Sequence, residues 1–297
     1  MNSDEVLSLL AFTWNAHHIN FCGNILNSNC SLPDFWNVIL ERIRIDNPVL
    51  IALAFQEGPH IDMDENMREI GYFLIGSDIA GGCSLFIYSR VPLGFEIVDI
   101  IHSLKSGSGV TLILRLPNNQ KWGITNICLQ KVSSLETVLR DIVYTPPMDY
   151  STILGSFPVK PSSCPLDELL IEPNLCARLK DPFTSNLPGL LLEEGPGNSG
   201  PTFAPSCYLS TNRQPNKEHL LRLISSGDPL PAIHQPTIND FNGKKAAWCD
   251  RIFYSTFRQN GPVRLTCLEY GRIDDPETSL HLSDHAIVYG YFTFILS

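Results

Sequence analysis

The sequence predicts an α/β protein built from packed sheets. Short apolar or alternating runs of strand length recur along most of the 297-residue chain. A few amphipathic segments with helical spacing lie between these runs, as expected for strands joined partly by helices. With 43% hydrophobic and 18% charged residues, the chain can bury a sizeable core. This composition excludes a disordered, collagen-like or coiled-coil protein.

The strand-length runs follow one another from the start of the chain to its end. The run at 49–55 is continuously apolar, which is typical of a strand covered on both faces. Together the runs predict strands at 7–14, 49–55, 83–88, 110–116, 122–129, 150–154, 251–254, 263–268 and 286–295.

Helical spacing is clearest at 35–43, directly after a Ser31-x-x-Asp34 pattern that resembles a capping box. Two further helices are predicted at 134–143 and 213–225. Proline and glycine cluster at 157–205 and 227–236, but strands of core type lie on both sides of them. We therefore interpret these stretches as surface excursions within a single domain that covers residues 1–297.

Charge and apolar run length restrict the partners. Acidic residues outnumber basic ones 31 to 21, which gives a net charge of -10 and argues against nucleic acid as a partner. The apolar runs are too short for a membrane span. No basic run is longer than Lys244-Lys245, so any membrane contact is expected to be peripheral.

The cysteine pattern predicts free thiols. The chain has nine cysteines, an odd number, and none of them forms a C-x-x-C pair. Asp4 and Glu5 stand where a secretory signal would carry basic residues. We therefore expect a reducing compartment and a cytoplasmic location.

Four polar groups of residues stand at the ends of apolar strands, where sheet proteins present their active sites. They are Thr13-Trp14-Asn15, Phe55-Gln56-Glu57, Trp248-Cys249-Asp250-Arg251 and Ser283-Asp284-His285. Each one alone is explained as well by a turn, a solvated carboxylate or a structural ion pair. Together they supply hard oxygen ligands for Mg²⁺ and a histidine beside acidic residues. That set suits metal-assisted hydrolysis of a phosphate ester.

The order of these motifs resembles that of the endonuclease/exonuclease/phosphatase superfamily, and more narrowly that of the inositol polyphosphate 5-phosphatases. Residues 244–252 read KKAAWCDRI, similar to the family's basic-x-P-A-W-C-D-R-I-L signature. Residues 202–208 read TFAPSCY, similar to its T-F-x-P-T-Y-K segment. The resemblance extends from about residue 10 to residue 294.

The resemblance implies a four-layer α/β/β/α sandwich of the DNase I-like type, with the site at one rim. It implies a phosphorylated inositol or phosphoinositide headgroup as the ligand, and Mg²⁺ as the cofactor. The roles that it implies follow by motif position. Asn15, Glu57 and Asp284 would hold the metal. His285 would contact the phosphate or the attacking water and would be oriented by Asp250, while Arg251, Lys244 and Lys245 would lie near substrate phosphates, with a structural role for Arg251 as the alternative.

The sequence departs from the family at the positions that face the phosphate. The G-D-x-N segment here reads Gly155-Ser156-Phe157-Pro158, so its Asp and Asn are replaced by Ser156 and Pro158. Cys128 stands at the histidine of the N-S-H-L segment, and Tyr208 at the lysine of P-T-Y-K.

Two functions stay open at this point. The first is a Mg²⁺-dependent 5-phosphatase whose catalysis is impaired, because each lost group typically reduces the rate about 10²–10³-fold. The second is a non-catalytic protein that binds a phosphorylated ligand or a protein partner through the same cleft. A nuclease of the same superfamily is a third possibility, which the acidic charge disfavours.

Overall fold

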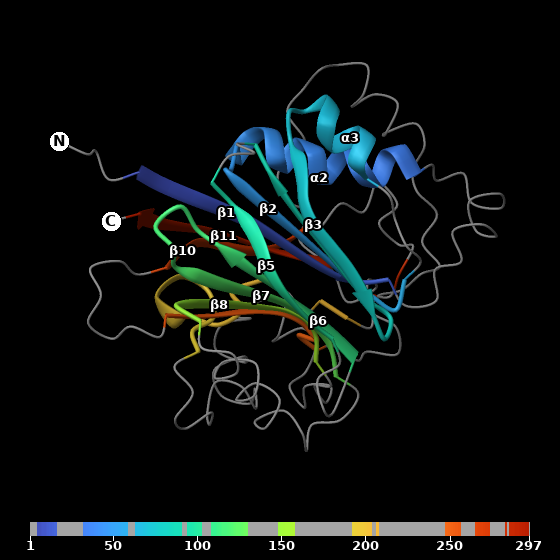
Figure 1. The fold of residues 1–297 in the computed structure, drawn as a ribbon. Coiled ribbons are helices and arrows are strands. Elements are labelled where there is room, and N and C mark those ends of the chain that lie inside the picture. Colours follow the sequence, from blue (N-terminus) through green and yellow to red (C-terminus); the bar gives the residue numbers. More distant parts are fainter. Residues whose placement is uncertain are drawn as a thin grey trace.

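Figure 1 shows two sheets packed face to face, with helices over the outer face of one of them. This computed structural model describes the following residues of the chain: 5–16, 32–58, 63–90, 94–102, 108–129, 148–157, 192–203, 206–207, 247–256, 265–273, 283 and 285–296. No helix in this part of the chain is long and apolar enough to cross a membrane.

The first sheet has six strands, and β1 pairs with β2 in parallel at its centre. The other neighbours in this sheet are antiparallel. Across the sheet, the strands are β10 (Thr266–Ile273), β11 (Ile287–Leu296), β1 (Glu5–Asn15), β2 (Leu50–Gln56), β4 (Cys83–Ser89) and β3 (Phe73–Ala80).

The second sheet has five strands, of which only β7 and β8 run parallel. Its order is β5 (Glu96–His102), β6 (Ser108–Arg115), β7 (Lys121–Cys128), β8 (Tyr150–Ser156) and β9 (Asp250–Thr256). Helices α2 (Leu32–Asp46) and α3 (Asp64–Glu69) cover the first sheet, and a short 3₁₀ helix, η2 (Pro196–Asn198), precedes β9.

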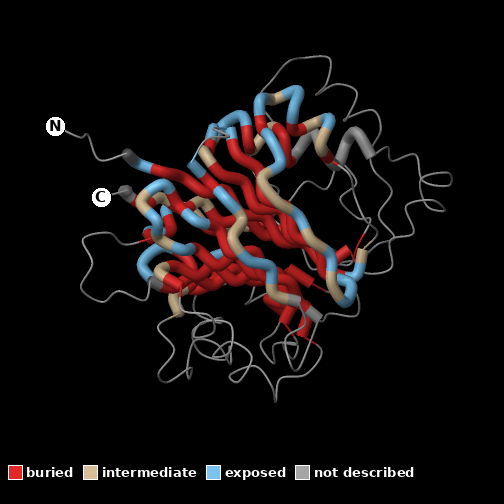
Figure 2. Tube along the Cα trace, viewed as in Figure 1, coloured by how far each residue is buried: buried red, intermediate tan, exposed pale blue. Residues whose placement is uncertain are grey.

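Strand β1 shows why its sequence is apolar without alternation. Leu9 and Ala11 point into the core between the two sheets, while Leu10 and Phe12 point into the core beneath the helices. Both faces of the strand are therefore buried, as the central red tube in Figure 2 shows. Each large side chain buried in this way contributes about 1.5–3 kcal/mol to folding.

The strands and the first helix predicted from the sequence are present, with some shifts. The run predicted at 263–268 forms β10 further along the chain, at Thr266–Ile273. Strands β3 and β5 were not predicted, because each contains a β-bulge that breaks the period of two, between Leu74 and Gly76 and between Ile97 and Asp99. The helices predicted at 134–143 and 213–225 lie outside the described residues, as does Ser31 of the capping box.

Candidate functional site

The polar motifs meet at one rim of the sandwich. Strand register explains this, because Asn15 pairs with Gln56, Cys128 pairs with Ser156, and Ser156 pairs with Asp250. Residues more than two hundred positions apart in the sequence therefore share one edge of two neighbouring sheets.

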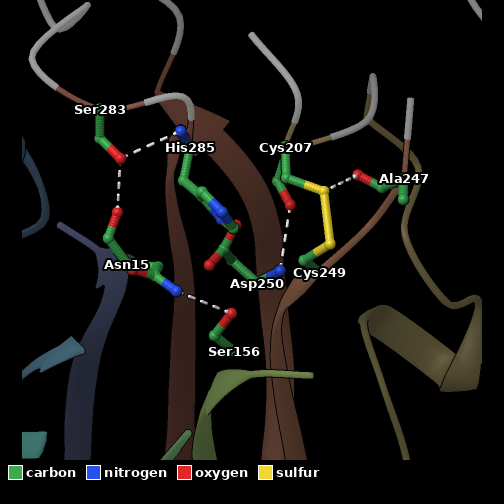
Figure 3. The surroundings of a disulfide bond; sticks show 9 residues. Asn15, Ser156, Cys207, Ala247, Cys249, Asp250, Ser283 and His285 are labelled. Carbon is green, nitrogen blue, oxygen red and sulfur yellow. Dashed lines mark hydrogen bonds and ion pairs between the residues drawn. A yellow bond between two sulfur atoms is a disulfide. The ribbon is translucent and has the colours of Figure 1, made fainter. Parts of the chain in front are cut away.

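The centre of the rim is a pair formed by Asp250 and His285 (Figure 3). Nδ1 of His285 lies 2.8 Å from Oδ2 of Asp250. The Asp250 side chain is 0% exposed and the His285 side chain 12% exposed. Among the described residues, Oδ1 of Asp250 has no hydrogen-bond partner. A buried carboxylate thus holds a partly exposed imidazole, and one of its oxygens has no partner in the described part of the chain.

Three hydrogen bonds fix the backbone that carries His285. The hydroxyl of Ser283 donates to the carbonyl oxygen of Asn15 at 2.7 Å and accepts the N–H of His285 at 3.2 Å. The indole N–H of Trp14 donates to the carbonyl oxygen of His285 at 3.0 Å. Trp14 and Ser283, which the sequence offered only as motif neighbours, therefore connect the end of β1 to the start of β11.

Ser156 lies at the end of β8, directly across from Asp250. Its hydroxyl accepts a hydrogen bond from the amide nitrogen of Asn15 at 3.2 Å, and both side chains are buried. Gly155 precedes it with φ at +157°, where an added Cβ would stand 2.0 Å from the carbonyl oxygen of Ile127. A glycine is required here because β7 and β8 approach too closely for a side chain.

Glu57 and Cys128 form a second corner of the rim. Glu57 is exposed, and its φ of +54° is a left-handed conformation that costs about 1 kcal/mol or more for a residue with a side chain. The thiol of Cys128 lies 3.4 Å from a carboxylate oxygen of Glu57. Burial raises the pKa of the Cys128 thiol far above its ordinary value, and the nearby Cys83 and Glu57 add to this. A neutral thiol therefore faces a carboxylate at the position where the resembling family has a histidine.

Gln56 and Asn126 join the two sheets behind this corner. The Gln56 amide nitrogen donates to Thr13 Oγ1 at 3.0 Å and to Asn126 Oδ1 at 2.7 Å. The Asn126 amide nitrogen donates to the carbonyl oxygens of Phe55 and Ser84, each at 2.8 Å. Gln56 and Asn126 are fully buried, so the motif residue Gln56 and its partner Asn126 serve the fold.

Arg251 points away from the rim, because successive residues of a strand face opposite sides. Its side chain is 0% exposed and forms a two-pronged ion pair with Glu194, with Nε donating to Oε1 at 2.7 Å and Nη2 donating to Oε2. The hydroxyl of Tyr270 also donates to Glu194, at 2.7 Å, and burial raises the pKa of Tyr270 well above its usual range. The position of Arg251 fits the structural role that was given above as the alternative. It does not fit a contact with a substrate phosphate.

Five of the residues predicted for the site lie outside the described part of the chain. They are Asp284, Lys244, Lys245, Pro158 and Tyr208.

The expectation of free thiols is wrong for two cysteines. Cys207 and Cys249 form a disulfide, with Cα atoms 6.0 Å apart and a sequence separation of 42. Cys128 and Cys267 are free and buried, and Cys83 is also buried. Spacing could not reveal the pair, because the contact arises when Cys207 pairs with Ala247. Disulfides persist mainly in oxidising compartments, so this one weighs against a reducing compartment, and the cytoplasmic location stays a prediction.

The described residues hold part of a possible metal site. No three His, Cys, Asp or Glu side chains within the described ranges come together as a metal-binding group. Asn15 is the last residue of β1, Glu57 directly follows the neighbouring strand β2, and both offer hard oxygen donors. The Asn15 amide nitrogen is engaged by Ser156, so its amide oxygen is the atom that it would offer to a cation. Two such donors suit Mg²⁺, which usually keeps several water ligands.

Solved structures share this fold although the sequences have diverged. The sequence matches no protein-family model and no curated protein sequence. A Cimex nitrophorin in its ferrous NO complex is 17% identical, with a TM-score of 0.62 over 98% of this chain and 99% of that chain. The inositol polyphosphate 5-phosphatase domain of SPsynaptojanin, in complex with inositol (1,4)-bisphosphate and calcium, is 13% identical, with a TM-score of 0.57 over 98% of this chain and 85% of that chain.

A third similar structure is D. rerio TDP2 complexed with a single-strand DNA product. It is 14% identical, with a TM-score of 0.53 over 97% of this chain and 99% of that chain. At such identities the comparison establishes the fold. The predicted fold class, a DNase I-like sandwich of the endonuclease/exonuclease/phosphatase type, is thereby confirmed.

Proposed function

We propose that this chain is a protein of the inositol polyphosphate 5-phosphatase type that binds a phosphorylated inositol headgroup at the rim and hydrolyses phosphate esters weakly or not at all. One observation carries this proposal. Ser156 lies opposite Asp250, hydrogen-bonded to Asn15, where the resembling family has the aspartate that positions the attacking water. A serine hydroxyl is no general base at neutral pH without an activator of its own.

The remaining polar groups suit binding better than turnover. His285 is held by Asp250 through Nδ1, which leaves Nε2 as the ring nitrogen to meet a phosphate oxygen. The buried Cys128 thiol keeps its proton, and its S–H is only a weak donor to a ligand. Each missing proton-transfer or electrostatic group lowers the rate about 10²–10³-fold, so turnover would fall toward the uncatalysed rate.

Mg²⁺ is the proposed cofactor, held by Asn15 and Glu57 with Asp284 as a further ligand. When bound, the cation would polarise a phosphoryl oxygen. Asp250 holds the imidazole in one tautomer, and Ser156 keeps the Asn15 amide oriented.

The alternative is a non-catalytic protein that binds a ligand or a protein partner through this rim. It gains support from the Cimex nitrophorin, whose structure is a ferrous NO complex on the same fold. Nucleic acid was expected to be excluded by the net charge of -10. The structure of D. rerio TDP2, which has a similar fold, contains a single-strand DNA product. The fold therefore does not support excluding nucleic acid.

The experiment restores the missing carboxylate. Phosphate release from inositol phosphates and phosphoinositides that carry a phosphate at position 5 is measured with Mg²⁺ for the wild type and for Ser156→Asp. The new carboxylate can accept the hydrogen bond from Asn15 and act on water. We expect release to rise at least about 10²-fold over a wild type that is near background.

Ser156→Asn is the matched control, because asparagine has the shape of aspartate without its charge. Its phosphate release should stay at the wild-type level. His285→Ala in the Ser156→Asp background should abolish the gain. Fast release by the wild type that is lost in His285→Ala would show that another group has replaced the aspartate, and the proposal of impaired catalysis would then fail. Absence of both release and inositol phosphate binding would favour the alternative.

A further inference from the structure

The disulfide between Cys207 and Cys249 lies beside the Asp250–His285 pair (Figure 3). Cys249 immediately precedes Asp250 in the sequence. Cys207 forms an isolated β-bridge with His285 on one side and with Ala247 on the other. One covalent bond therefore joins the backbone next to the imidazole to the backbone next to its carboxylate.

The segment 206–207 contacts both halves of the pair. The hydroxyl of Ser206 accepts the N–H of Asp250 at 3.1 Å. The carbonyl oxygen of Ser206 accepts the N–H of Ala286, the residue after His285, at 2.7 Å. The segment thus lies between β9 and the start of β11, and its position sets the distance between the two side chains.

We expect breaking the disulfide to move this segment. Two thiols cannot remain at the distance of a covalent bond, so the two sulfur atoms separate after reduction. Both cysteines are buried, at 1% and 7% exposure, and their neighbours leave little room for that separation. The displacement passes to Ser206, which carries the hydrogen bonds to Asp250 and Ala286.

We propose that the Cys207–Cys249 disulfide positions the Asp250–His285 pair, and that its reduction by a dithiol switches the rim to a state that binds its ligand more weakly. The inference rests on the proposed function only in the choice of ligand. One thiolate of the dithiol attacks a sulfur of the disulfide, forming a mixed disulfide and releasing the other cysteine as a thiolate. The second thiol of the reductant then closes its own disulfide, so two electrons and two protons pass to Cys207 and Cys249.

Trp14 provides a local probe of this switch. Its indole N–H donates to the carbonyl oxygen of His285, so its resonance reports the position of that backbone. The indole N–H of Trp122 donates to Thr152 Oγ1 at 2.9 Å in the core between the sheets and serves as the internal reference. Both signals would be followed in the ¹⁵N-labelled full chain and assigned with Trp14→Phe and Trp122→Phe.

The experiment compares the protein before and after treatment with dithiothreitol, with thiols counted in each state. Reduction should free the thiols of Cys207 and Cys249, identified by alkylation and peptide mass spectrometry, move the Trp14 resonance and leave that of Trp122 in place. The apparent Kd for inositol (1,4)-bisphosphate should rise about tenfold if the paired arrangement is then populated about a tenth of the time. Cys207→Ser/Cys249→Ser should resemble the reduced protein and ignore the reductant, whereas Cys267→Ser, at a free buried cysteine, should respond like the wild type.

Three outcomes would overturn the inference. They are an unchanged Trp14 resonance after two new thiols appear, a thiol count that does not rise, and an equal shift of Trp14 and Trp122. If neither redox state binds inositol (1,4)-bisphosphate, the proposed function fails, while the Trp14 signal still decides the role of the disulfide.

Discussion

Asp250 and Arg251 are neighbours in the sequence, but they occupy opposite faces of β9 and have opposite roles. Arg251 is buried beside Glu194, which also accepts the hydroxyl of Tyr270. Asp250 is buried too, but its partner His285 is partly exposed, and one of its oxygens has no partner among the described residues.

The comparison shows that one sequence motif can contain a residue that stabilises the fold and a residue that can act on a ligand. A buried charge whose partner is equally buried stabilises the fold and is closed to a ligand. A buried charge that holds a partly exposed titratable group can act on a ligand through that group.

The largest effect is expected on the free energy of unfolding, at the buried ion pair of Arg251. Arg251→Ala leaves the carboxylate of Glu194 buried without its cation, and we expect the free energy of unfolding to fall by about 3–5 kcal/mol. Urea denaturation measures it. Arg115→Ala removes the cation of an exposed pair with Glu96 and should change the same quantity by less than about 1 kcal/mol. Equal effects of the two substitutions would contradict the structural role of Arg251.

A smaller effect on stability and a large one on chemistry are expected at Asp250. Asp250→Asn keeps the shape and should change the free energy of unfolding by about 1.5 kcal/mol or less, the net value of one hydrogen bond. In the Ser156→Asp background it removes the carboxylate that orients His285, and phosphate release should fall about 10²–10⁴-fold. A loss of stability as large as that of Arg251→Ala, with release intact, would sink the contrast between the two faces.

The smallest effect concerns the thiols of the second corner. Burial raises the pKa of Cys83 to about 12, and it raises the pKa of Cys128 as well. In the unfolded chain, cysteine thiols have a pKa of about 8.5. As the pH rises above that value, the unfolded state loses protons that the folded state keeps, so the stability decreases. Urea denaturation at increasing pH should show this decline, and Cys128→Ser should make it shallower. A wild type whose stability does not fall with pH would contradict the burial of these thiols.

Local pattern predicts much of this molecule. The apolar runs predict the strands of both sheets, because burial on both faces leaves a plain signature. The bulged edge strands β3 and β5 escape prediction, because one extra residue shifts the alternation. Motif order also predicts which residues share a site, but it gives no direction for their side chains.

What the sequence by itself determined is therefore the class of fold. The ligands of the rim and the replacement of the family's aspartate by Ser156 stay predictions from the resemblance. Tertiary structure alone decided that Arg251 turns away from the rim, that Gln56 joins the sheets, and that Cys207 meets Cys249. The physical reason is that propensity and burial act on neighbouring residues. Register and face depend on pairing between strands that are far apart in the chain, such as β8 with β9 and β1 with β11.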